Sequence, residues 1–202
     1  MEWDTPSGRP RRDERGNGGL SRPRQADLLR KWGLRLEKKL GQHFLADPSV
    51  PARIVDCIER FEPDRVVELA SGAGALSFAL LERNWPVHAL EIDPRMIELM
   101  TAEAAGRAFT IEACDLATED FTRHIDGRRL VFAGNLPYQV TSAILFNLLP
   151  ALREPSVAGA VVMVQNEVAQ RMVAGPGSRT LSLIHISEPT RQYCQSRMPS
   201  SA

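Results

Sequence analysis

Short apolar runs alternate with amphipathic stretches from residue 65 onward, and this alternation is the main structural signal of the sequence. The apolar runs predict strands over residues 65–70, 87–92, 108–113, 130–133 and 157–164. The amphipathic stretches predict helices over residues 75–83, 94–104, 141–149 and 165–173. Because the strands are apolar without alternation and are separated by helices, both faces of their sheet should be covered. The pattern predicts a doubly wound α/β domain with a mainly parallel sheet.

Two further helices are predicted before the first strand. One begins near Ala26 and continues to Leu40, interrupted only by Gly33. After a loop over residues 41–45, Asp47 caps the second helix, which has a proline in its first turn. Its apolar stripe consists of Val50, Ile54, Val55, Ile58 and Phe61. We assign both helices to the same domain as the sheet, over residues 26–180.

Residues 1–25 are rich in Gly, Pro, Arg and Ser and have almost no apolar content, so they predict a disordered basic extension. The first 40 residues hold eleven Lys and Arg against six acids, and the chain as a whole is neutral. A basic arm before an acidic body fits contact with a polyanion, and a solvated tail that binds nothing fits the charge equally well.

Composition narrows the class of protein. A chain of 202 residues is long enough for one full domain, and its longest apolar run is far too short to span a bilayer. No secretory signal follows the N-terminus, and early acidic residues argue against a transit peptide. The three cysteines form no CxxC pair, which favours a reduced, cytoplasmic setting without a disulfide scaffold or a zinc site. We therefore expect neither a membrane nor a metal among the partners.

The loop after the first predicted strand contains Gly72 and Gly74, at the strand end where α/β sheets bind ligands. Glycines there let a ligand approach bare backbone at a helix N-terminus, although a purely structural turn fits the loop equally well. A dinucleotide fingerprint would need a third glycine at Ser77. Glu68, placed by the pattern near this loop, would repel a pyrophosphate. A cationic cofactor therefore fits better.

Carboxylates follow the next two predicted strands. Glu91 ends the second strand, where an acid can accept both ribose hydroxyls of an adenosine. Asp115 follows the third strand, where it can accept from an adenine amino group. Taken singly, Glu91 could be a solvated strand-end acid and Asp115 a turn residue. Together with the glycine loop they describe a nucleoside pocket without phosphate-binding features, which fits S-adenosylmethionine.

The tetrad Asn135-Leu136-Pro137-Tyr138 follows the fourth predicted strand and carries the strongest chemical signal. An exocyclic adenine amine is a poor nucleophile because its lone pair is delocalised into the ring. The Asn135 side-chain oxygen and the Leu136 carbonyl can hold its two hydrogens and expose that lone pair, while Pro137 restricts Leu136 to extended geometry. Tyr138 offers a face on which an extruded base can stack. The alternative, a loop Asn beside a buried Tyr, fits the placement less well.

The sequence resembles the small-subunit ribosomal RNA adenine N6,N6-dimethyltransferase family over residues 35–180. The motifs that carry the resemblance are residues 39–45, 68–76, 91–93, 134–138 and 164–168. The resemblance implies a Rossmann-like class I methyltransferase that uses S-adenosylmethionine to dimethylate adenines of small-subunit rRNA in ribosome biogenesis. It implies a partner, the pre-ribosomal small subunit, and we expect the protein to act as a monomer. By motif, the cofactor contacts are His43, Leu45, Ala70, Gly72, Glu91, Asp115 and Asn135, and the target base is held by Asn135, Leu136 and Tyr138.

The chain departs from the family pattern in three places. His43 stands where the family usually has Asn, and Ala70-Ser71 replaces Gly-Pro. The family's last core strands and its C-terminal helical domain are missing, which leaves a sheet edge unpaired. Residues 181–202 instead begin with a segment that resembles a translated sequencing adapter, so we expect a non-native tail and little or no turnover by this chain.

Three alternatives remain at this point. One is the erythromycin-resistance type of enzyme, which applies the same chemistry to large-subunit rRNA. Another is a ribosome-assembly factor that docks without essential catalysis. The third, a nicotinamide oxidoreductase, is opposed by the tetrad and by the missing glycine at Ser77.

Overall fold

The computed structural model describes residues 23–35, 47 and 49–173. The predictions made for residues 1–22, for the loop over 41–45 and for the tail after 173 lie outside these described residues. Within them, no helix is both long enough and apolar enough to cross a membrane.

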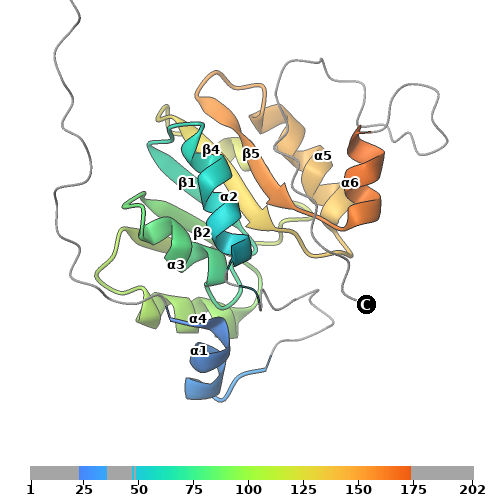
Figure 1. The fold of residues 1–202 in the computed structure, drawn as a ribbon. Coiled ribbons are helices and arrows are strands. Elements are labelled where there is room, and N and C mark those ends of the chain that lie inside the picture. The colour runs from blue at the N-terminus through green and yellow to red at the C-terminus, as the bar shows by residue number, and fades with distance from the viewer. Residues whose placement is uncertain (1–22, 36–46, 48, 174–202) are drawn as a thin grey trace, which may run out of the picture.

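Five parallel strands form one sheet in the order β3-β2-β1-β4-β5 (Figure 1). They are β1 (Arg65–Leu69), β2 (Val87–Glu91), β3 (Phe109–Ala113), β4 (Leu130–Asn135) and β5 (Val157–Met163). Each lies within two residues of its predicted bounds. The prediction of a doubly wound α/β domain with a mainly parallel sheet is confirmed, and β3 and β5 are the edges of the described sheet.

The helices alternate with these strands along the chain. They are α1 (Gln25–Lys31), α2 (Ser49–Glu59), α3 (Ala75–Leu81), α4 (Pro94–Glu103), α5 (Thr141–Ala151) and α6 (Asn166–Val173). The Asp47 carboxylate accepts a hydrogen bond from the Ser49 N–H at 2.8 Å, as expected of the residue that caps α2. The predicted length of the first helix is wrong. It ends at Lys31 because Gly33 adopts the left-handed conformation, with φ of 64°, and residues beyond 35 are not described.

A short 3-10 helix, η3 (Phe121–His124), lies before β4 and was not predicted. The Asp120 carboxylate caps it by accepting from the Thr122 N–H at 3.0 Å. Its Phe121 is fully buried and meets Phe132 of β4 edge to face, with ring centroids 5.9 Å apart. The helix depends on one buried aromatic residue and one cap, and neither repeats along the sequence. Hydrophobic periodicity therefore could not predict it.

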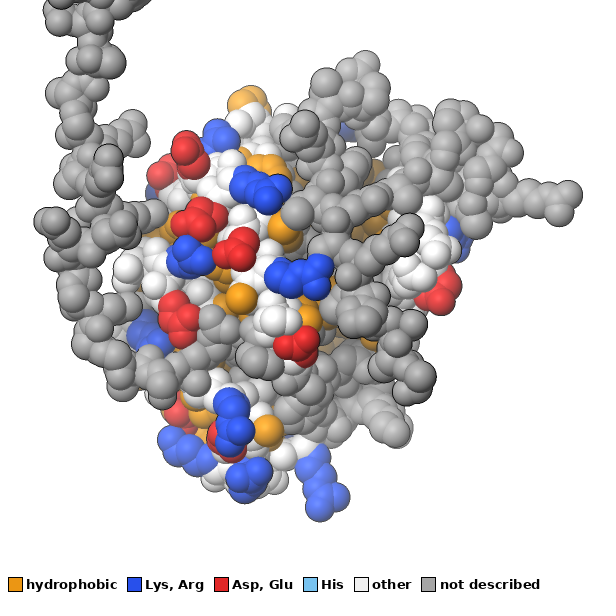
Figure 2. Space-filling model, in the orientation of Figure 1, with side chains coloured by type: hydrophobic (Ala, Val, Ile, Leu, Met, Phe, Trp, Pro, Cys, Tyr) orange, Lys and Arg blue, Asp and Glu red, His pale blue; other side chains and the backbone are white. Residues whose placement is uncertain are grey.

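Two apolar layers cover the two faces of the sheet. Val66 of β1 belongs to the cluster formed with α1, α2, α3 and α4, whereas the adjacent Val67 belongs to the cluster with η3 and α5. Adjacent strand residues point to opposite faces, so burial on both sides explains why the strands read as apolar without alternation. On the side seen in Figure 2, acidic and basic side chains are interspersed. Arg83, in the turn between α3 and β2, forms ion pairs with Asp56 and Glu59 of α2.

Candidate functional site

The predicted site residues that the structure describes lie along the carboxyl edge of the sheet. Pairing of β1 with both β2 and β4 sets Leu69 beside Leu90 and Gly134. The glycine loop, Glu91 and Asn135 follow directly from these paired positions, and Asp115 follows β3 one strand further out. His43 and Leu45 lie outside the described residues. Strand order therefore brings together segments that are up to 65 residues apart in sequence, from Ala70 to Asn135.

The loop after β1 is built from left-handed residues. Ala70, Gly72 and Gly74 have φ of 59°, 52° and 79°. For the two glycines this conformation carries no steric penalty, but an L-residue such as Ala70 loses about 1–2 kcal/mol there. Gly74 has a second constraint, because a Cβ at this position would lie 2.4 Å from the Met100 Sδ of α4. The departure from glycine at Ala70 thus places strain where the loop leaves the sheet.

Glu91 ties the end of β2 to this loop. Its Oε2 accepts from the Gly72 N–H at 2.7 Å, and its Oε1 accepts from the N–H groups of Ile92 and Asp93 at 2.9 and 3.0 Å. Burial raises the pKa of the Glu91 carboxyl, and the three backbone donors oppose that rise. A carboxylate has about four acceptor positions, so roughly one remains for a ribose hydroxyl. Glu91 therefore holds the loop in place at the end of β2.

Asp115 lies exposed in the turn after β3. Its Oδ1 accepts from the Ala117 N–H at 3.0 Å, and its backbone carbonyl accepts from the Thr118 N–H at 3.1 Å. The residue therefore forms the turn that the sequence allowed as an alternative role. This turn also holds the carboxylate at the carboxyl edge, where the predicted adenine contact requires it.

The tetrad begins at Asn135, the last residue of β4, and is held by contacts with β5 and α5. The Leu136 N–H donates to the Met163 carbonyl of β5 at 3.0 Å, and the Leu136 side chain is 1% exposed. The Pro137 carbonyl accepts from the Thr141 hydroxyl at 2.8 Å, which joins the turn to α5. Tyr138 is 42% exposed. The turn is thus anchored through Leu136 while Tyr138 stays at the surface, as a stacking platform requires.

Gly134 sets how closely the tetrad approaches the glycine loop. A Cβ at Gly134 would lie 2.3 Å from the Leu69 carbonyl oxygen of the paired strand β1. Only a residue without a side chain permits this contact between β4 and β1. This role of Gly134 was not predicted, although a glycine inside an apolar strand is a recognised sign of close backbone approach.

Glu68 was predicted to place a charged carboxylate near the glycine loop, and this prediction is wrong. Glu68 lies inside β1 and is 1% exposed, so its carboxyl does not line the loop. Burial raises its pKa to about 8, against hydrogen bonding from Ser77, and the nearby Glu91 adds to the rise. The carboxyl is therefore mostly protonated at neutral pH. A cationic ligand cannot be inferred from its charge.

Glu68 should make the stability of the fold depend on pH. Its pKa is about 8 in the folded chain and near its ordinary value of about 4.5 in the unfolded chain, so the folded state binds more protons between these values. We expect the free energy of unfolding to fall by about 2 kcal/mol between about pH 5 and pH 7 relative to Glu68→Gln. Denaturant titrations across this range measure it, with Glu98→Gln on the exposed face of α4 as the control. Parallel curves for the wild type and Glu68→Gln would contradict the assignment.

The carboxyl edge suits a nucleoside-type cofactor in its donor and acceptor groups. The edge segments, residues 70–74, 91–92, 114–115 and 135–138, contain no Lys or Arg to bind a phosphate. Among the described residues, only the Gln25 Nε2 comes within 4 Å of a Cβ placed at Gly72, at 3.9 Å, so the described part of the chain leaves this backbone largely uncovered. The Ser71 hydroxyl is buried and has no hydrogen-bond partner among the residues that the structure describes. These groups fit S-adenosylmethionine better than a dinucleotide.

The fold and this edge define the Rossmann-like class of S-adenosylmethionine-dependent methyltransferases. A family model described as ribosomal RNA adenine dimethylase matches residues 33–188. The chain belongs to the ribosomal RNA adenine dimethylase family.

Relatives with curated names are similar over most of the chain. Ribosomal RNA small subunit methyltransferase A of Xanthomonas axonopodis pv. citri is 38% identical over 160 residues, which are 79% of this chain and 60% of that protein. The protein of the same name from Clostridium perfringens is 35% identical over 174 residues, or 85% of this chain and 60% of that protein. The chain thus spans about 60% of the length of these relatives.

Two solved structures share the fold and some of the sequence. A dimethyladenosine transferase from Plasmodium falciparum matches with a TM-score of 0.56 and 26% identity, over 69% of this chain and 50% of that one. The 23S rRNA methyltransferase ErmE matches with a TM-score of 0.50 and 28% identity, over 64% of this chain and 50% of that one. The structural likeness therefore includes a 23S rRNA methyltransferase as well as a dimethyladenosine transferase.

Proposed function

We propose that this chain is the catalytic domain of a small-subunit rRNA adenine dimethyltransferase. It transfers methyl groups from S-adenosylmethionine to the N6 of adenine and forms N6,N6-dimethyladenosine during ribosome biogenesis. The observation that carries the proposal is the tetrad at the carboxyl end of β4, with Leu136 anchored to β5 and Tyr138 exposed. The names of the curated relatives favour the small subunit as the source of the substrate.

Three residues of the tetrad take part in the proposed chemistry. The Asn135 side-chain oxygen and the Leu136 carbonyl accept the two amine hydrogens, which draws the nitrogen toward tetrahedral geometry and exposes its lone pair. Tyr138 stacks on the extruded base, worth about 1–3 kcal/mol. S-adenosylmethionine supplies a methyl group already activated on a sulfonium. The protein then contributes mainly by positioning, and a strong general base is unnecessary.

The cofactor is proposed to bind along the rest of the edge. Ala70 and Gly72 offer backbone at the loop, Glu91 meets the ribose, Asp115 meets the adenine, and Asn135 lies beside the methyl donor. His43 and Leu45 complete this set by the family motif. We propose a cytoplasmic location, the pre-ribosomal small subunit as partner, and a monomeric state.

Cofactor binding can be tested first and methyl transfer second. Calorimetry on the 202-residue chain should detect binding of S-adenosylmethionine and no binding of NAD. Methyl transfer should be measured with an extended chain, in which residues 1–180 are followed by the sequence that the gene itself encodes after Thr180. Undermodified small-subunit particles and free large-subunit RNA serve as competing substrates. We expect dimethyladenosine in the small-subunit particles. Labelling of large-subunit RNA alone would identify the erythromycin-resistance type, and NAD binding would refute the class.

A further inference from the structure

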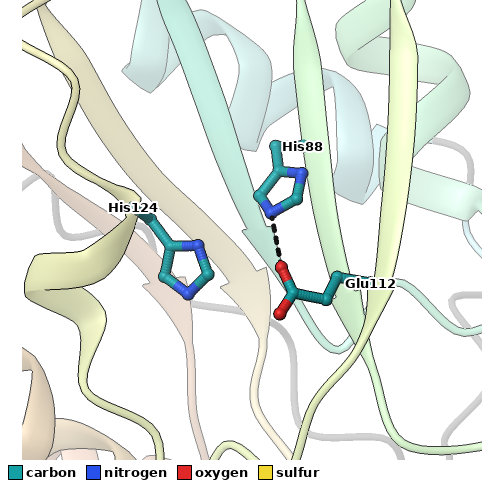
Figure 3. A group of neighbouring side chains, drawn as sticks. All are labelled: His88, Glu112 and His124. Carbon is teal, nitrogen blue, oxygen red and sulfur yellow. Dashed lines mark ion pairs between the residues drawn. The ribbon is translucent and has the colours of Figure 1, made fainter.

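Two histidines and a glutamate from three elements meet on the face of the sheet beside η3. His88 lies on β2, Glu112 on β3 and His124 on η3, and one ligand atom from each lies within 4.8 Å of the others (Figure 3). The His88 Nε2 is 3.5 Å from the Glu112 Oε2, and the two imidazole centroids are 5.3 Å apart. All three residues line a cavity of about 590 Å³.

Outer hydrogen bonds orient both imidazoles. The Thr110 hydroxyl oxygen is 2.8 Å from the His88 Nδ1, and the Glu119 Oε1 is 3.1 Å from the His124 Nε2. Each ring is therefore held through one nitrogen and keeps its other nitrogen for the cluster. Metal-binding histidines in proteins are held in this way, by an oxygen acceptor on the nitrogen that does not bind the metal.

We propose that His88, Glu112 and His124 bind a divalent transition-metal ion, with zinc as the best match. Two imidazoles and one carboxylate are a ligand set that suits zinc and not magnesium or calcium, which prefer oxygen ligands. Ligand atoms around tetrahedral zinc lie about 3.3 Å apart, so the cluster must contract on binding. The side chains of Glu112 and His88 are 44% and 21% exposed, which leaves them room to rotate. Water would occupy the fourth position.

The charges around the cluster are largely paired with one another. Arg65 and Arg128 both bond the Asp126 carboxylate, and Arg123 bonds Glu119. The Arg107 guanidinium lies over the Phe78 ring, 5.3 Å from its centroid. These contacts direct the guanidinium groups to partners of their own and reduce their repulsion of a cation.

The proposed metal would join β2, β3 and η3. His88 is three residues before Glu91 on the same strand, so the site lies on the sheet face and not at the carboxyl edge. Its role would be to secure η3 and the following segment to the sheet. Since no residue of the tetrad takes part, this inference does not depend on the proposed function.

Zinc chloride is the probe for this site. Isothermal titration of the reduced 202-residue chain should show zinc binding, with a rise in melting temperature. Glu112→Gln and His88→Gln should each lower the affinity at least tenfold, and Thr110→Val should lower it about tenfold while keeping the stoichiometry. His185→Gln, which removes an imidazole that is not one of the three proposed ligands, is the matched control.

Asn135→Ala should bind zinc as the wild type does, which separates this site from the proposed methyl-transfer site. Glu112 and His88 are partly exposed, so their variants should fold, and circular dichroism checks this. No zinc binding by the folded wild type would overturn the proposal. So would unchanged affinity in both Glu112→Gln and His88→Gln, since the zinc would then be bound elsewhere on the chain.

Discussion

Gly134→Ala is expected to destabilise the fold by more than about 4 kcal/mol, enough to abolish cooperative unfolding in a domain of ordinary stability. The added Cβ would lie 2.3 Å from the Leu69 carbonyl oxygen and 2.9 Å from the Leu69 Cβ. Neither atom can move alone, because Leu69 is fully buried and its strand β1 is paired on both sides. The strands would have to separate, with loss of hydrogen bonds at the centre of the sheet. Thermal and denaturant unfolding measure the change.

Gly106→Ala is the matched control for this prediction. No atom of the described residues lies within 4 Å of a Cβ placed at Gly106, but the residue has a φ of 77°. The same chemical change should therefore cost only the left-handed strain of about 1–2 kcal/mol. Equal destabilisation by the two variants would show that close approach of β4 to β1 is not what requires glycine at position 134.

Asn135→Ala should reduce methyl transfer about 10²–10³-fold, the usual loss when one preorganised group that stabilises the transition state is removed. Asn135 is the last residue of β4 and is half-buried. Pairing with Met163 of β5 fixes its backbone position. Removing its amide oxygen leaves the Leu136 carbonyl as the single acceptor for the target amine. Single-turnover methylation of undermodified small-subunit particles by the extended chain measures the rate.

The control for this variant is Asn84→Gly. Asn84 lies exposed in the turn before β2 with a φ of 58°, a conformation that glycine accepts without strain. Its loss should leave the methylation rate unchanged. If Asn135→Ala methylates as fast as the wild type while remaining folded, the tetrad does not hold the target amine.

Hydrophobic periodicity predicted nearly all of the secondary structure because the burial that produces it is itself periodic. The ends of elements depended instead on single residues. The first helix stops at Lys31 because Gly33 turns left-handed, whereas the helical apolar pattern continues beyond it. Helix η3 is anchored by Phe121 and capped by Asp120, and neither feature repeats along the chain.

The candidate site could be found from sequence where strand ends carry unusual residues, as at Glu91, Asp115 and Asn135. What those residues contact could not be found in that way. The Glu91 carboxylate accepts hydrogen bonds from three backbone N–H groups, and one of them belongs to Gly72, 19 residues earlier. Glu68 was misread because its burial depends on α3 packing over β1, which the spacing of residues does not report.

The amino-acid sequence by itself determined the succession of strands and helices along the chain, the parallel α/β class and the segments that meet at the carboxyl edge. These follow from local periodicity and from the rule that parallel strands end on the same side. Tertiary structure alone decided that Glu68 is buried with a raised pKa, that Gly134 lies too close to Leu69 of β1 to carry a side chain, and that His88, Glu112 and His124 converge. Such properties depend on distances between residues far apart in the chain, and those distances are set by packing.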